Sequence, residues 1–176
     1  MKNLFAFIFF VFFCNVFCIA QDSIKRHNNI QHNLYFELLG NSIAFYNITY
    51  DCSFKIAEKH KIAVGFGGQY FPNISGFQNK MFGLSPQINY LYGKRHHLEL
   101  GTGYTIQLMP KEYELDYLAT IPVRVGYRFQ KSEGGYFWKI GYVALFGEAI
   151  RGEMWRSFPF VPWSGVAWGY TFKNKK

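Results

Sequence analysis

Phe82-Gly83-Leu84-Ser85-Pro86-Gln87-Ile88-Asn89-Tyr90-Leu91-Tyr92 alternates between two kinds of side chain. The even positions are apolar or aromatic, and the odd positions are small or polar except at Leu91. Successive side chains of a β-strand point to opposite faces, so a period of two marks a strand rather than a helix. The stretch therefore predicts one strand with an apolar face and a polar face.

The same alternation recurs along most of the chain, and glycine-containing turn signals at 40–41, 93–94 and 134–135 separate several of the segments. An even number of antiparallel strands can close into a barrel, which leaves no unpaired edge. We therefore predict an all-β fold, an eight-stranded antiparallel up-and-down barrel. Its strands are expected at 33–39, 42–52, 61–70, 82–92, 97–106, 119–129, 136–146 and 165–172.

The composition of the two faces indicates which one points inward. Nine of the 17 glycines lie on the polar face, where small side chains suit the narrow interior of eight strands. A water-facing surface would carry more charges than this face does. The other face is almost uncharged and rich in aromatic rings, which suits lipid, so a transmembrane barrel is favoured over a soluble lipocalin-like periplasmic binding barrel with its faces reversed. With Lys61 assigned to the adjoining turn, the charges on the polar face are Glu37, Asp51, Glu99, Arg124, Arg128 and Lys139.

The first twenty residues have the form of a secretory signal peptide. Lys2 precedes an apolar run over 4–13, and small residues near Ala20 predict cleavage after that residue. Lipidation at Cys14 or Cys18 is disfavoured because a bulky Phe precedes each, and a helical anchor would need about 20 apolar residues. Residues 21–32 would form an N-terminal periplasmic segment, 33–172 the barrel and 173–176 a basic tail. Cys52 would then be alone, without a disulfide or a cysteine metal site.

A chain that arrives through a signal peptide begins in the periplasm, which would place both termini and the short turns there. These parts carry eleven basic and three acidic residues, whereas the outer loops carry four and five. A basic surface of this kind suits anionic outer-membrane lipids. Nucleic acid is not expected as a partner, because the charges lie in turns and tails rather than along one face. The expected oligomeric state is a monomer.

Charged side chains enclosed in the lumen are costly unless they pair. We expect Arg124 and Lys139, on neighbouring strands, to meet Glu99 and Glu37. Structural packing of the lumen is favoured over a gated, porin-like conduction path.

No catalytic constellation stands out, and no cofactor or metal is expected. A lipid-modifying enzyme of the outer membrane, which remains an alternative, would need a His beside a nucleophile or an acid near the outer leaflet. No His-x-Ser sequence occurs, and adjacent His96 and His97 point to opposite faces. All the histidines fall in or beside the expected periplasmic turns: His27, His32, His60, His96 and His97.

The longest loop, 147–162, carries Met154, Trp155, Phe158 and Phe160. Exposed aromatic residues on an outer loop can form a binding surface. They can equally pack down onto the barrel rim, which is the favoured interpretation.

Three segments carry a family resemblance: YFELLGNSIAFYNITYD at 35–51, GKRHHLELGTGY at 93–104 and PWSGVAWGYTF at 162–172. Together they resemble small, uncharacterised outer-membrane β-barrel proteins of Gram-negative bacteria. The resemblance implies the barrel fold and an outer-membrane location, and no activity. It also implies that Phe172 is the aromatic signal read by the barrel assembly machinery, although four residues follow it here.

Overall fold

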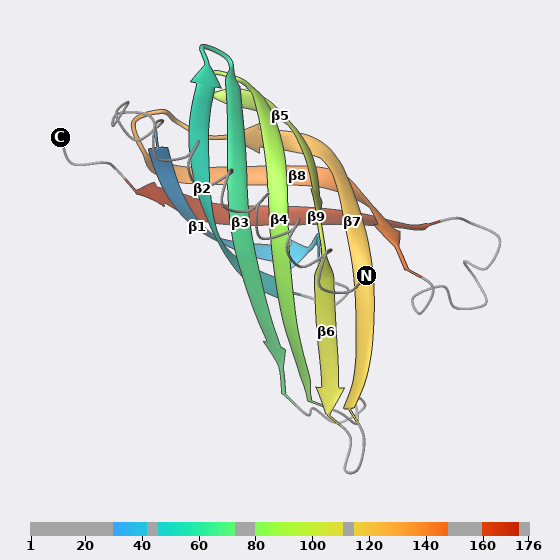
Figure 1. Ribbon diagram of the computed structural model, residues 1–176. Coiled ribbons are helices and arrows are strands. Elements are labelled where there is room, and N and C mark those ends of the chain that lie inside the picture. The colour runs from blue at the N-terminus through green and yellow to red at the C-terminus, as the bar shows by residue number, and fades with distance from the viewer. Residues whose placement is uncertain (1–29, 42–45, 73–79, 111–114, 148–159, 173–176) are drawn as a thin grey trace, which may run out of the picture.

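The computed structural model describes residues 30–41, 46–72, 80–110, 115–147 and 160–172. In these ranges the chain forms one antiparallel sheet of nine strand segments (Figure 1). The segments are β1 (Ile30–Leu39), β2 (Tyr46–Ala57), β3 (His60–Phe71), β4 (Met81–Gly93), β5 (His96–Gly103), β6 (Thr105–Pro110), β7 (Leu115–Phe129), β8 (Gly135–Phe146) and β9 (Val161–Phe172).

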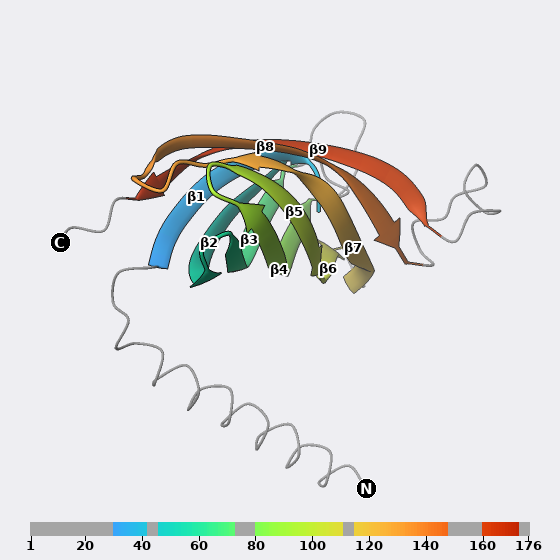
Figure 2. The same ribbon diagram turned by 90° about the horizontal axis from the view of Figure 1, so that it is seen from above.

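The sheet closes on itself because β1 pairs with both β2 and β9. The closing ladder runs from His32 opposite Phe172 to Leu39 opposite Gly165. β5 and β6 lie between the same two neighbours, β4 and β7, so they are one strand interrupted at Tyr104. Eight antiparallel strands in sequence order therefore make a ring, which confirms the predicted up-and-down barrel. Figure 2 shows β1, β8 and β9 arching over one side, with β2, β3, β4 and β6 opposite.

Several strands are longer than the alternation predicts. β7 begins at Leu115 rather than at 119, β9 begins at Val161 rather than at 165, and β6 extends the fifth strand to Pro110. Backbone pairing continues there, as between Pro110 and Leu115, although the sequence no longer alternates clearly. Residues 42–45 of the predicted second strand lie outside the described part.

The apolar face of each strand points outward. On β4, Leu84 and Ile88 are 49% and 48% exposed, whereas Ser85 and Gln87 are 3% and 4% exposed. The other strands show the same phase, with polar residues buried and large apolar residues exposed. The transmembrane arrangement is thus confirmed, and the soluble lipocalin-like alternative is wrong because its apolar residues would line the interior.

Two facing glycines allow close packing of the backbones of β7 and β8. Gly126 pairs with Gly141, and a Cβ at Gly126 would lie 2.6 Å from the Ile140 carbonyl oxygen and 2.8 Å from the Gly141 Cα. Gly126 separates the inward positions of Arg124 and Arg128 on β7. The lack of side chains at this glycine pair lets the backbones of the two strands approach closely.

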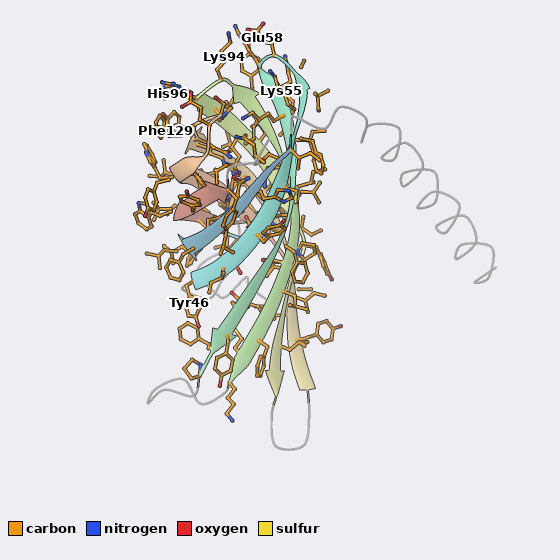
Figure 3. The ribbon with its side chains drawn as sticks, turned by 90° about the vertical axis from the view of Figure 1, so that its left-hand side faces the viewer. Tyr46, Lys55, Glu58, Lys94, His96 and Phe129 are labelled. Atoms are coloured by element: carbon orange, nitrogen blue, oxygen red, sulfur yellow. The ribbon has the colours of Figure 1, made fainter. Side chains whose placement is uncertain are left out.

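One end of the barrel, called the turn end here, carries the tight connections. The turns Glu58-Lys59 and Lys94-Arg95 have two residues each, and the start of β1 and the end of β9 lie at this end as well. Figure 3 shows Lys55, Glu58, Lys94 and His96 gathered there. The third connection at the turn end, 130–134, has five residues. The opposite end, called the loop end, carries the connections 40–45, 72–80, 111–114 and 147–160. Among the described residues, no helix is long and apolar enough to cross a bilayer.

An arginine on the outward face tests which way the faces point. Ile88→Arg in the middle of β4 should lower the free energy of unfolding in lipid vesicles by about 2–4 kcal/mol, because the charge would enter hydrocarbon. Tyr136→Arg, at the turn end of β8, is the matched control and should cost about 0–1 kcal/mol. Denaturant titration of reconstituted protein measures both. Equal costs at the two positions would contradict a lipid-facing belt.

Candidate functional site: a charged lumen

Four charged side chains from four strands meet inside the barrel. Arg124 on β7 contacts Glu37 on β1 at 2.5 Å and Glu99 on β5 at 3.7 Å. Lys139 on β8 contacts the same two carboxylates at 3.6 and 3.3 Å. Each cation therefore touches both anions, and all four side chains are at most 5% exposed. We call Glu37, Glu99, Arg124 and Lys139 the quartet.

Tyr35 contacts the quartet on the side nearer the turn end. The Lys139 Nζ donates to the Tyr35 hydroxyl at 3.2 Å and lies 4.3 Å from the centroid of its ring. The Gln87 side-chain amide donates to the same hydroxyl at 2.6 Å. Tyr35 has the parity of Glu37 on β1, so strand alternation places both side chains in the lumen.

A second ion pair crosses the lumen between opposite walls. Arg128 on β7 donates to Asp51 on β2, with its Nη1 3.0 Å from Oδ2. β2 and β7 are separated by β1, β9 and β8 on one side of the eight-stranded ring, so they stand across from each other. Asn33 donates to the same carboxylate at 2.5 Å, and the Arg128 guanidinium lies over the Phe137 ring at 4.5 Å. The Arg128–Asp51 ion pair therefore connects β2 and β7 across the lumen.

Neutral hydrogen bonds extend the packing toward the turn end. Gln130 donates to Asn33 at 2.7 Å and to the Thr171 hydroxyl at 3.0 Å, and Thr171 donates to Asn33 at 2.7 Å. These residues come from β1, from the residue after β7 and from β9. The described lumen is thus crossed by side-chain bonds at several levels, as expected for a structural core.

Lys61 corrects the assignment of charges to the lumen. The sequence predicts a turn position for Lys61, but it lies on the inner face of β3, is 7% exposed and donates to Gln31 at 2.9 Å. Lys61 lies at an odd position of β3, as the inward-facing Ala63 and Gly65 do, so the alternation itself indicates that its side chain points into the lumen. The prediction of three charges of each sign is therefore wrong: the buried charges of the described part are three acidic and four basic.

The outward face carries two bands of aromatic rings. At the turn end Tyr127 contacts Trp138 at 5.1 Å between centroids, and toward the loop end Tyr70 contacts Phe82 at 4.9 Å. Aliphatic side chains such as Ile88 occupy the belt between the bands. Aromatic residues favour the two membrane–water interfaces, so two aromatic bands flanking an aliphatic belt are the pattern of a transmembrane barrel.

Three histidine–tyrosine pairs lie within the band at the turn end, and the sequence pattern did not predict them. Each joins the Nδ1 of a histidine on one strand to a tyrosine hydroxyl on the next, as in His32 with Tyr50 at 2.6 Å and His60 with Tyr90 at 2.5 Å. The third pair is His96 with Tyr127. In each pair the tyrosine lies two residues away from the direct partner of the histidine, a spacing that only the strand register reveals.

The remaining residues selected from the sequence do not join the lumen. Phe160 contacts Phe146 on the rim, with centroids 5.5 Å apart, whereas Met154, Trp155 and Phe158 lie outside the described residues. Phe172 ends β9, faces outward and contacts Tyr170. Cys52 is a free, half-buried thiol. No group of three His, Cys, Asp or Glu side chains within the described ranges could hold a metal ion.

Closed antiparallel pairing, an apolar exterior between aromatic bands and a charged, packed lumen together define an eight-stranded transmembrane β-barrel. No protein-family model and no curated protein sequence matches the chain. Among solved structures it is similar to three barrels, each aligned over 82% of this chain.

The N-terminal β-barrel domain of Pseudomonas aeruginosa OprF is 11% identical with a TM-score of 0.48, and 98% of that chain is covered. Neisserial surface protein A is 11% identical with a TM-score of 0.47 and 95% covered. Ail, the attachment invasion locus protein of Yersinia pestis, is 10% identical with a TM-score of 0.44 and 97% covered. The fold class rests on the strand pairing and burial of this chain, and these likenesses carry no argument about function.

Removing one partner of the cross-lumen pair should be costly. Arg128→Leu leaves the Asp51 carboxylate buried without its guanidinium, and we expect a loss of about 3–5 kcal/mol in the free energy of unfolding. Arg128→Leu combined with Asp51→Asn should recover a large part of that loss, because no unpaired charge remains. Denaturant titration in micelles measures both variants. A double variant no more stable than Arg128→Leu alone would contradict the pairing.

Proposed function

We propose that this chain is an outer-membrane β-barrel with a closed polar lumen and a structural or surface-interaction role. The observation that carries the proposal is the ring of eight strands with an apolar belt outside and paired charges inside. A closed barrel satisfies its backbone hydrogen bonds within the protein, which the interior of a bilayer requires. Outer-membrane lipids are the partners that such a belt would contact.

We propose that the turn end faces the periplasm. Short turns at one end and longer loops at the other are the usual asymmetry of barrels in bacterial outer membranes. The basic residues of the turns, among them Lys59, Lys94 and Arg95, would then lie beside the headgroups of the inner leaflet. Phe172, at the end of the closing strand, is the proposed signal for the barrel assembly machinery, and the barrel is proposed to act as a monomer.

The lumen supports a structural role rather than a transport role. Arg124 and Lys139 each contact two carboxylates, so a passing ion would have to displace bonds that already satisfy the charges. The loops at the opposite end from the short turns are then the parts available for interaction at the cell surface. Phe160 packs against Phe146 at the base of the longest one.

Fractionation and gel mobility test the location and the closure together. The native protein should sediment with outer membranes and should migrate differently before and after boiling in detergent, because a closed barrel resists the detergent until it is heated. Recovery in the osmotic-shock fraction, with one mobility before and after boiling, would contradict the proposal.

Conductance tests the closed lumen. In planar bilayers the wild-type protein should give no large, steady current, and Arg124→Leu should lower thermal stability without opening a pore, since the other side chains still cross the lumen. Ile121→Leu, on the outward face of β7, is a control that leaves the lumen unchanged. A large steady current through the wild-type protein or Arg124→Leu would refute a structural lumen.

A further inference from the structure

The lumen has a basic cluster where it opens at the turn end. Lys61 and His97 face inward from β3 and β5, and Lys55 stands at the rim on the end of β2. Figure 3 shows Lys55 at this end of the barrel. Only β4 separates β3 from β5. On β4, the partner of Lys61 is Leu91 and the partner of His97 is Gly93, two residues away, so both side chains enter the lumen at nearly the same level.

Two lysines of the cluster oppose each other directly. In the ladder between β2 and β3, Lys55 is the partner of Lys61, and both have the inward parity of their strands. Like charges directly opposite on neighbouring strands destabilise a sheet. An anion bound between the two ammonium groups would attract both of them and offset this repulsion.

His97 has unused hydrogen-bonding capacity in the same space. Its side chain is completely buried, and neither ring nitrogen has a hydrogen-bond partner among the described residues. Its direct partner across the β5–β7 ladder is Arg128, whose guanidinium is engaged by Asp51. A buried imidazole always has at least one N–H to donate, and leaving it unpaired is costly.

The charges within the lumen do not balance. The quartet is neutral in sum, and Arg128 is offset by Asp51, so among the described buried groups Lys61 is the cation without an acidic partner. Its ammonium donates to the neutral Gln31 amide oxygen at 2.9 Å. A water molecule could satisfy His97, but it would not offset the charge of Lys61.

We propose that a single inorganic anion of halide size binds at this mouth of the lumen. The Lys61 ammonium and a ring N–H of His97 hold it from inside, and Lys55 closes over it from the rim. The narrow lumen of eight strands restricts the occupant to a small ion. The anion neutralises the positive charge of Lys61, which no acidic side chain of the lumen offsets.

Thermal unfolding of the full-length mature barrel in neutral detergent tests the site, with chloride or bromide compared with gluconate at equal ionic strength. At about ten times its dissociation constant, the halide should raise the midpoint by about 3–6 °C. Lys61→Met should abolish this difference and should be at least as stable as wild type in gluconate, since the uncompensated charge is gone. Lys59→Met, in the exposed turn nearby, should keep the full difference.

Two results would overturn the proposal: equal midpoints in halide and gluconate for the wild type, or the same loss of the difference in Lys59→Met as in Lys61→Met. If Lys61→Met does not fold, anomalous diffraction from wild-type crystals grown in bromide decides. A bromide peak in contact with Lys61 and His97 supports the site, and a peak confined to the surface or none at all refutes it. These readouts concern only the occupant of the lumen, so they stand apart from the location of the barrel.

Discussion

In hydrocarbon no water is present to pair with a peptide group, so each backbone N–H and C=O must find its partner within the protein. The ladder between β1 and β9 meets this requirement for the strands that would otherwise be edges. Once the ring is closed, period-two alternation sends every second side chain into lipid and every other one into the lumen. Ile88 is exposed and its neighbour Gln87 is buried because the strand alternates within this closed ring.

Eight strands leave an interior that is only wide enough for side chains, and this limits what the lumen can contain. Charged groups in such a space are stable only with partners, which explains why Arg124 and Lys139 share Glu37 and Glu99. The glycine pair Gly126 and Gly141 lets the backbones of β7 and β8 pack closely. Lys61 has no acidic partner among the described buried groups, and its ammonium donates to the neutral Gln31 side chain.

The alternation was sufficient to predict the fold, because the phase of a strand can be read locally, as at 82–92. It also placed Glu37, Asp51, Glu99 and the three basic residues on one face. It could not reveal the break at Tyr104 or the extension of β7 to Leu115, because hydrogen bonding with neighbouring strands decides these. The pairing of Arg128 with Asp51 depends on the register around the whole ring. The histidine–tyrosine pairs depend on the register between neighbouring strands. Lys61 was missed because its place at a strand end made it look like a turn residue.

The most direct measurement of which face meets lipid uses the native chain in vesicles whose phospholipids carry a photoreactive diazirine in the acyl chain. Illumination followed by peptide mass spectrometry locates the residues that the acyl chains touch. If the exposed face of β4 meets lipid, adducts are expected at Leu84, Ile88 and Tyr90. None is expected at Ser85, Gln87 or Asn89. Adducts on the second set, or on neither set, would contradict the lipid contact of the exposed face.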